Sequence, residues 1–253
     1  MIHSILIIGQ SNMAGRGFLA DAPRLDTVGG RLQVLRNGRW QGMFRPVNPD
    51  RPFSGTCLAE RFAQAYAMDH EGVTIGVIPC ADGGTTLDQW KEGSLLFDNA
   101  VYQTRLAMRT SHLVAILWHQ GEGDCGESKH PLYLEKITKI MTALRRELDA
   151  QDVPLLVGGL GDFLKDRAES PALANYPYIN DALRAFAASS SRTAYVDASG
   201  LKSNPDNLHF CREALDEFGQ RYYDVFRTLE DKDRIFDEKS KMDDAVRTEM
   251  ELL

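Results

Sequence analysis

The sequence lacks the features that mark several classes of protein. Its four cysteines, Cys57, Cys80, Cys125 and Cys211, have no paired spacing, which argues against a disulfide framework or a C-x-x-C zinc site and favours free thiols in a reducing cytoplasm. No segment approaches the roughly 20 apolar residues that cross a bilayer, and the apolar run after Met1 has no basic region before it, as an export signal would. We therefore expect a cytoplasmic protein that needs no metal and contacts no membrane.

Positive charge is also scarce. The 253 residues contain 36 acidic and 29 basic side chains, giving a formal net charge of −7, and no run of lysine or arginine stands out. Because a net-acidic surface repels polyanions, nucleic-acid binding is not expected. The length favours one large domain over two.

Short apolar runs alternate with helical patterns along most of the chain. Runs rich in Ile, Val and Leu with little alternation are typical of strands buried on both faces, and strand–helix alternation favours a parallel sheet covered on both sides. The sequence thus predicts an α/β fold, a three-layer sandwich with a five-stranded, mostly parallel sheet. The predicted strands are Ser4–Ile8, Val73–Cys80, Leu113–His119, Pro154–Leu160 and Thr193–Val196, and the predicted helices are Thr56–Met68 (with Ser54 as its cap), Leu95–Thr110, Leu132–Ala150, Pro171–Ala188 and Arg212–Leu229.

Two segments depart from this alternation. Two short runs around Asn37-Gly38 predict a β-hairpin within residues 30–45, which we expect beside the carboxyl end of the first strand. The polar segment 231–253 has apolar residues at helical spacing and predicts a helical extension to a domain formed by residues 1–230.

Polar residues and glycines gather where the predicted strands end, which is where open parallel sheets bind ligands. The first strand ends in "GQSNMAG", which places Ser11 on a strand-to-helix turn, either as a nucleophile or merely as a helix cap. His209 in "DNLHF" is the best-placed base, and Asp206, three residues earlier, could fix its tautomer. Together these residues are suited to acyl transfer.

Two further strand ends offer groups that could stabilise an oxyanion. "DGGTT" supplies the backbone N–H groups of Gly83 and Gly84, and "HQGEGD" supplies the side-chain amide of Gln120 beside Glu122. Taken singly, each stretch is also typical of an ordinary turn or polar loop. Gln120 could alternatively brace the loop that precedes Gly121.

Four blocks of the chain resemble motifs of the Ser-Gly-Asn-His hydrolases (SGNH/GDSL-like, with a flavodoxin-like fold). The resemblance is to the branch of carbohydrate esterase family six and the sialate O-acetylesterase-like proteins, and it runs in order from residue 9 to residue 210. The matching blocks are "GQSNMAG", "GGTTLDQW", "WHQGEGD" and "DNLHF".

The resemblance implies a role for each matching residue. Ser11 corresponds to the nucleophile, His209 to the base and Asp206 to its carboxylate partner. The oxyanion donors correspond to the Ser11 N–H, one of Gly83 and Gly84, and the amide of Gln120. The residues expected to support this site are Gln10, Asn12 and Glu122.

The resemblance further implies an acetylxylan esterase-like enzyme without a cofactor, which removes O-acetyl groups from a sugar or oligosaccharide through an acetyl-enzyme. Three alternatives remain open: a sialate O-acetylesterase, a short-chain acyl-ester or thioester hydrolase, and a carbohydrate-binding protein without catalysis. The sugar could stack on Trp40, Trp90 or Trp118, although Trp118 lies in an apolar run that favours the core.

Overall fold

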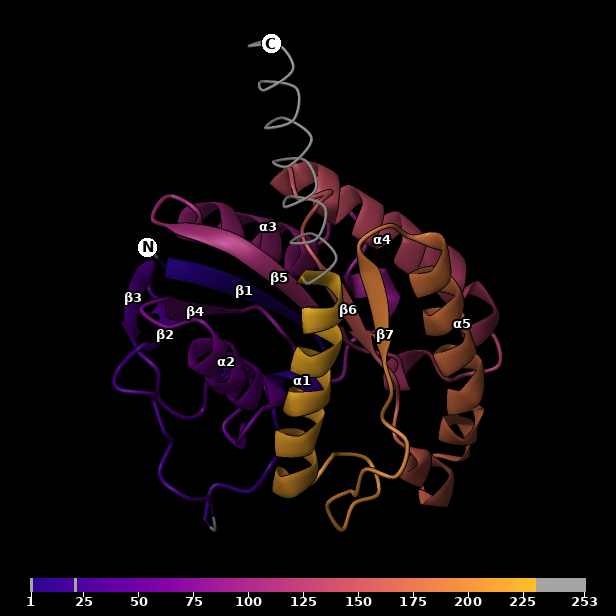
Figure 1. Ribbon diagram of the computed structural model, residues 1–253. Helices are drawn as coiled ribbons and strands as arrows, with labels where there is room; N and C mark the ends of the chain where they lie inside the picture. The colour runs from indigo at the N-terminus through magenta and orange to yellow at the C-terminus, as the bar shows by residue number, and fades with distance from the viewer. Residues whose placement is uncertain (1, 21, 231–253) are drawn as a thin grey trace, which may run out of the picture.

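A seven-stranded sheet lies between two layers of helices in the computed structural model, which describes residues 2–20 and 22–230 (Figure 1). The strand order is β3-β2-β4-β1-β5-β6-β7, and every neighbouring pair is parallel except β2 and β3. The five predicted strands are confirmed as β1, β4, β5, β6 and β7, and the α/β class is confirmed with them. The strands are β1 (Ile2–Gly9), β2 (Leu32–Arg36), β3 (Arg39–Gly42), β4 (Thr74–Pro79), β5 (Ser111–His119), β6 (Leu155–Gly158) and β7 (Thr193–Val196).

The hairpin predicted within residues 30–45 is confirmed as β2 and β3, but the predicted strand count and the expected place of the hairpin beside β1 were wrong. Asn37 and Gly38 have φ angles of 49° and 72°, as a tight hairpin turn requires. However, β2 pairs in parallel with β4, with Leu32 opposite Ile75, so the hairpin extends the sheet at its edge. The sheet therefore has seven strands instead of five. Because this pairing joins segments about forty residues apart, local sequence patterns do not reveal it.

Helices cover both faces of the sheet. Figure 1 shows α2 and the helix of residues 212–230 on one face, with the short α1, while α3, α4 and α5 follow one another across the other. Contacts between Phe62 of α2 and both Tyr223 and Phe226 join the first pair. The labelled helices are α1 (Ser11–Ala14), α2 (Leu58–Asp69), α3 (Leu95–Ala107), α4 (Tyr133–Leu148) and α5 (Tyr176–Ser189), with 3₁₀ turns η1 (Leu87–Gln89), η2 (Glu122–Asp124), η3 (His130–Leu132), η4 (Asp162–Asp166) and η5 (Pro171–Asn175).

The helix predictions differ from the structure mainly at their starts. The first predicted helix begins at Leu58 after Cys57, and Ser54 does not cap it but donates a hydrogen bond to Asp50. Residues 171–175 form a 3₁₀ turn before α5 begins. The predicted helical extension, 231–253, lies outside the described residues. Within the described ranges, no helix is both long and apolar enough to cross a bilayer.

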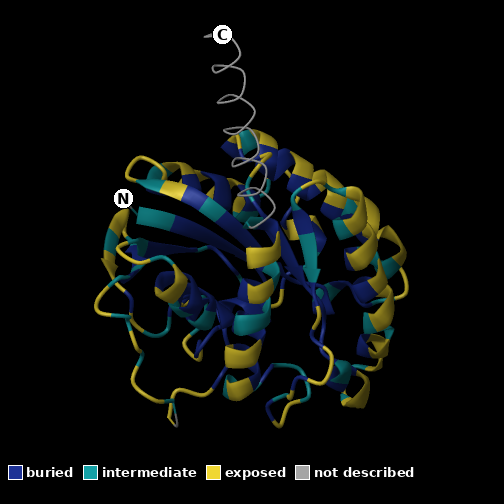
Figure 2. Cartoon of the chain, in the orientation of Figure 1, coloured by how far each residue is buried: buried dark blue, intermediate teal, exposed yellow. Residues whose placement is uncertain are grey.

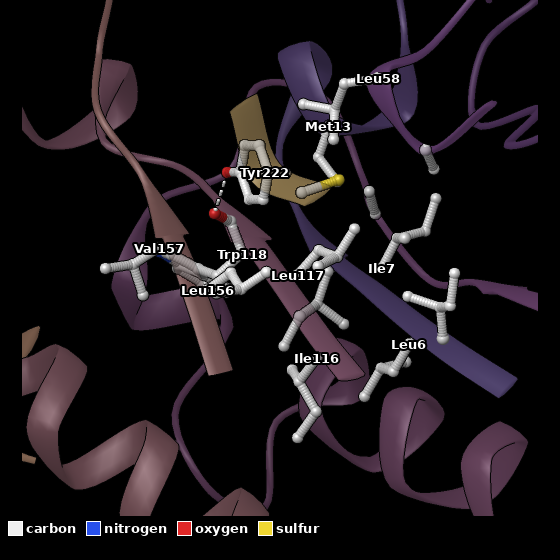
Figure 3. Close-up of a cluster of buried hydrophobic side chains, with 14 of the residues drawn as sticks. Leu6, Ile7, Met13, Leu58, Ile116, Leu117, Trp118, Leu156, Val157 and Tyr222 are labelled. Carbon is white, nitrogen blue, oxygen red and sulfur yellow. Dashed lines mark hydrogen bonds between the residues drawn. The ribbon is translucent and has the colours of Figure 1, made fainter. Parts of the chain in front are cut away.

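The core explains why the apolar runs become strands. Ile7, Leu117 and Leu156 are fully buried, and Figure 3 shows them at the centre of a cluster from three neighbouring strands. The helices bury the faces that meet the sheet and expose the others (Figure 2). Tyr222 donates a hydrogen bond of 2.7 Å to the carbonyl oxygen of Trp118, which ties the helix 212–230 to the end of β5. Packing of this kind holds the carboxyl ends of the strands in place.

Candidate active site

Ser11 is the first residue of α1, two residues after β1 ends at Gly9. Gly9 has φ of 130°, and a Cβ there would overlap the carbonyl oxygen of His119 on β5, so the close approach of these strand ends requires glycine. The Gln10 N–H donates to that same carbonyl oxygen at 2.9 Å. The chain therefore turns sharply and holds Ser11 at the carboxyl edge of the sheet.

A hydrogen-bonded chain connects Ser11, His209 and Asp206, although 198 residues separate the serine from the histidine. His209 Nε2 lies 3.0 Å from Ser11 Oγ, and His209 Nδ1 lies 2.6 Å from Asp206 Oδ2. Ser11 does not cap α1, since Gln10 occupies the N-cap position. The three side chains that the sequence analysis selected are thus brought together in the order that a serine nucleophile requires.

The Asp206 carboxyl group is held in its charged form. Burial alone would raise its pKa, but hydrogen bonds from the His209 backbone N–H, the His209 side chain and the Leu208 N–H outweigh burial, and the net pKa is lowered. Asp206 Oδ1 accepts both backbone N–H groups at 3.0 Å, which leaves Oδ2 for the imidazole. An ionised carboxylate in this position keeps the proton of a neutral imidazole on Nδ1 and leaves Nε2 able to accept one from Ser11.

Asn12 joins the turn that carries Ser11 to the loop that carries His209. Its Nδ2 donates to Glu122 Oε1 at 2.5 Å and to the carbonyl oxygen of Leu208 at 3.1 Å, and its Oδ1 accepts the N–H of Phe210 at 3.0 Å. Asn12 is 1% exposed, so these bonds are shielded from water. Two of the expected supporting residues, Asn12 and Glu122, therefore hold His209 in register with Ser11.

The third supporting residue, Gln10, joins the turn that carries Ser11 to the end of β5. Its Oε1 accepts the N–H groups of Gly121 and Gly123, at 3.4 and 3.2 Å. The strand ends that carry Ser11 and Gln120 are thereby fixed to each other.

The expected oxyanion donors differ in whether their N–H groups are free. The Gly83 N–H donates to Asp50 Oδ2 at 2.8 Å, and the Gln120 Nε2 donates to the Thr85 carbonyl oxygen at 3.1 Å and to Asp124 Oδ2 at 2.6 Å. The N–H groups of Ser11 and Gly84 donate to no residue in the described part of the chain. This geometry favours a bracing role for Gln120 and leaves Gly84 as the open donor of the glycine pair.

A buried ion pair beside Ser11 was not predicted from the sequence. Arg16 contacts both carboxylate oxygens of Asp50, at 2.9 and 2.7 Å, and the two side chains are 5% and 3% exposed. Asp50 also accepts the N–H of Gly83, whose Cα lies so near Ser11 that a Cβ there would be 3.3 Å from Ser11 Cβ. The pair fixes the loop of Gly83 and Gly84 (the glycine loop) against the turn that carries Ser11. Neither residue stands in a recognisable motif, so only their polar character within loops could have suggested them.

An open pocket of about 490 Å³ borders the hydrogen-bonded chain of Ser11, His209 and Asp206, with His209 and Asp206 in its wall. The loops of residues 16–20 and 52–55 form its other sides. The tryptophans expected to stack on a sugar do not line it: Trp90 and Trp118 are 1% and 0% exposed, and Trp40 packs over Gly76 at the sheet edge. The described residues contain no group of three or more His, Cys, Asp or Glu side chains arranged to hold a metal ion.

The chain is similar in sequence to known carbohydrate esterases. A family model described as "Carbohydrate esterase, sialic acid-specific acetylesterase" matches residues 2–228. A probable carbohydrate esterase from Arabidopsis thaliana is 26% identical over 240 residues, covering 85% of this chain and 86% of that protein.

Solved structures share the fold. One of an Arabidopsis thaliana protein has a TM-score of 0.78 at 25% identity and covers 89% of this chain and 98% of its own. The structure of NanS has a TM-score of 0.71 at 17% identity, covering 91% and 98%. A carbohydrate acetylesterase from Xanthomonas citri has a TM-score of 0.62 at 18% identity, covering 87% and 55%.

Proposed function

The chain belongs to the carbohydrate esterase family of sialic acid-specific acetylesterases, which makes it an esterase of carbohydrate acetyl esters, and we propose that it cleaves them through an acetyl-enzyme on Ser11. The observation that carries this proposal is the chain from Asp206 through His209 to Ser11, with distances of 2.6 and 3.0 Å. A serine hydroxyl is a weak nucleophile unless a base lies within hydrogen-bond reach. The proposal is supported by His209 Nε2, which lies within that reach of Ser11 Oγ, and by Asp206, which lies within reach of His209 Nδ1.

The first half of the proposed reaction forms the acetyl-enzyme. Ser11 Oγ attacks the acetyl carbonyl carbon while His209 Nε2 takes the hydroxyl proton, and the carbonyl oxygen becomes an oxyanion. The N–H groups of Ser11 and Gly84 bind that oxygen. The intermediate then collapses: the bond to the sugar oxygen breaks, and His209 returns its proton to that oxygen.

The second half restores the enzyme. Water attacks the acetyl carbon of the ester on Ser11, and His209 takes a proton from the water and returns it to Ser11 Oγ as acetate leaves. Asp206 remains ionised throughout, because its lowered pKa keeps it charged beside the imidazolium that forms in each half. In this scheme Gln120 positions the glycine loop through the Thr85 carbonyl oxygen and does not touch the substrate.

A chain-length series tests the proposed function against its alternatives. We expect the purified protein to release acetate from an acetylated sugar and from ethyl acetate, and to lose activity steeply as the acyl chain lengthens to hexanoate and octanoate. A preference for the longer chains would instead indicate a lipase- or thioesterase-like hydrolase. Binding of the acetylated sugar without any turnover would indicate a carbohydrate-binding protein.

A further inference from the structure

One pocket borders His209, the residue that acts on the leaving group in the proposed reaction. In the proposed reaction, on which this inference depends, His209 protonates the oxygen of the departing sugar. The sugar must therefore sit next to His209 and away from the glycine loop. The pocket of about 490 Å³ whose wall contains His209 and Asp206 lies next to this histidine.

The walls of this pocket are joined to one another by hydrogen bonds. Residues 15–17 and 55–56 pair through their backbones: the Gly55 N–H donates to Gly15, and Gly17 and Thr56 bond each other in both directions. Asn204 donates from Nδ2 to the carbonyl oxygen of Arg16, and its backbone N–H donates to the carbonyl oxygen of His209. Three loops that are remote in sequence thus form one pocket around the catalytic histidine.

Exposed aromatic rings lie in the pocket walls. Phe53 is 69% exposed and Phe18 is 58% exposed, although both are large apolar side chains. One face of Phe53 lies over the Arg16 guanidinium, 5.2 Å from the ring centroid, which holds the ring in place by a cation–π contact. An aromatic surface of this kind fits the apolar C–H face of a sugar ring, while the ring hydroxyls remain in water.

The charges in the pocket favour an uncharged sugar. Arg16 is the one arginine or lysine among the described residues that line it, and both of its terminal nitrogens are bonded to Asp50 while its Nε is buried. Asp206, in contrast, presents a carboxylate that is 40% exposed. A sugar acid placed here would bring its carboxylate near Asp206, and no lysine or arginine among the described lining residues is free to pair with it. The neighbouring Arg167 lies outside that lining and donates to the carbonyl oxygen of Asp206.

We propose that this pocket binds the sugar of the ester, that Phe53 and Phe18 pack against its ring, and that the preferred substrate is an O-acetylated neutral pyranose and not an acetylated sugar acid. Phe53 then determines specificity without taking part in bond cleavage. Its loss should weaken binding of a sugar ester and leave the chemistry at Ser11 intact.

The test compares Phe53→Ala with a matched control. Phe44 is also an exposed phenylalanine, 48% exposed and 5.2 Å from an arginine guanidinium, but it lies outside this pocket. Steady-state kinetics are measured for wild type, Phe53→Ala and Phe44→Ala with three substrates: ethyl acetate, an acetylated methyl xylopyranoside and an O-acetylated N-acetylneuraminic acid. Acid release in a pH-stat gives kcat and KM for each.

We expect wild type to prefer the neutral xyloside over the sugar acid. Phe53→Ala should raise KM for the xyloside about tenfold, because it removes roughly 50 Å² of apolar contact with the sugar. The kcat for the xyloside and the turnover of ethyl acetate should not change. Phe44→Ala should match wild type throughout. An unchanged xyloside KM in Phe53→Ala, an equal loss on ethyl acetate, or a preference for the sugar acid would each overturn the inference while leaving the esterase intact. Inactivity on all three esters would overturn the proposed function as well.

Discussion

At the scale of single residues, the proposed mechanism treats Asp206, His209 and Ser11 as one unit. His209→Ala removes the base, and Asp206→Asn leaves the imidazole without the carboxylate that accepts its Nδ1 proton at 2.6 Å. Each change should lower kcat by several orders of magnitude, about 10³- to 10⁵-fold, and the double variant should lose little more than His209→Ala alone. Steady-state kinetics on a small acetyl ester measure this, and losses that simply multiply would contradict a shared step.

A second residue-scale prediction concerns Gln120, whose substitution should affect the stability of the protein more than its kcat. Its two N–H groups satisfy the Thr85 carbonyl oxygen and the Asp124 carboxylate, whose pKa burial raises in spite of that bond. Gln120→Ala should therefore lower the free energy of unfolding by about 2 kcal/mol, because it leaves buried acceptors unpaired. Gln120→Glu should be worse, since it places a second carboxylate beside Asp124.

The Gln120→Ala variant also distinguishes a bracing role of Gln120 from a role in binding the oxyanion. Denaturant unfolding and kinetics are measured on one preparation of Gln120→Ala. A bracing residue changes stability more than kcat. A fall in kcat of about 10²- to 10³-fold with unchanged stability would instead show that the amide binds the oxyanion.

At the scale of elements, the Asp50–Arg16 pair makes loop packing depend on pH. Burial alone would raise the Asp50 pKa, but hydrogen bonds from Arg16 and Ser54 and the Arg16 charge lower it below its ordinary value. A carboxyl group with a lowered pKa in the folded state stabilises the fold above its unfolded pKa of about 4, and this stabilisation is lost as the pH falls through the folded pKa.

Asp50→Asn should therefore destabilise the protein by about 3 kcal/mol at neutral pH, because Arg16 is left buried without its partner charge. The difference from wild type should shrink as the pH falls below about 4. Urea unfolding from neutral to acidic pH measures both effects, with Asp181→Asn as the control because that side chain is 74% exposed. A penalty that stays constant with pH would show that the Asp50 charge is not responsible.

At the same scale, local sequence patterns predicted the buried strands but not the pairing of elements that are distant in the chain. The five buried strands were predictable because continuous apolar runs such as Ile5–Ile8 are typical of strands that are buried on both faces. The pairing of β2 with β4 was not, since it joins elements far apart in the chain. In the site, Ser11 and His209 stand in recognisable motifs, whereas the contacts of Asp50 and Phe53 depend on loops that meet only in the folded protein.

At the scale of the whole molecule, topology explains why the site lies where it does. Strands β2, β3 and β4 lie on one side of β1, and β5, β6 and β7 lie on the other, so β1 and β5 meet where the strand order reverses, which is where open α/β sheets bind ligands. Ser11 follows β1 and Gln120 follows β5. The helix of residues 212–230, bonded to β5 through Tyr222, begins just after the loop that carries His209. The fold thus brings Ser11 and His209, 198 positions apart in the sequence, together beside these strand ends.

The turnover of Ser11→Ala on a small acetyl ester tests the central claim most directly. Ser11 makes its side-chain hydrogen bond to His209, so the variant should keep the melting temperature of wild type, while kcat falls by about 10⁴- to 10⁶-fold. Ser189→Ala, at the end of α5 and away from the site, should keep full activity. A folded Ser11→Ala protein that hydrolyses the ester nearly as fast as wild type would contradict the proposed acetyl-enzyme.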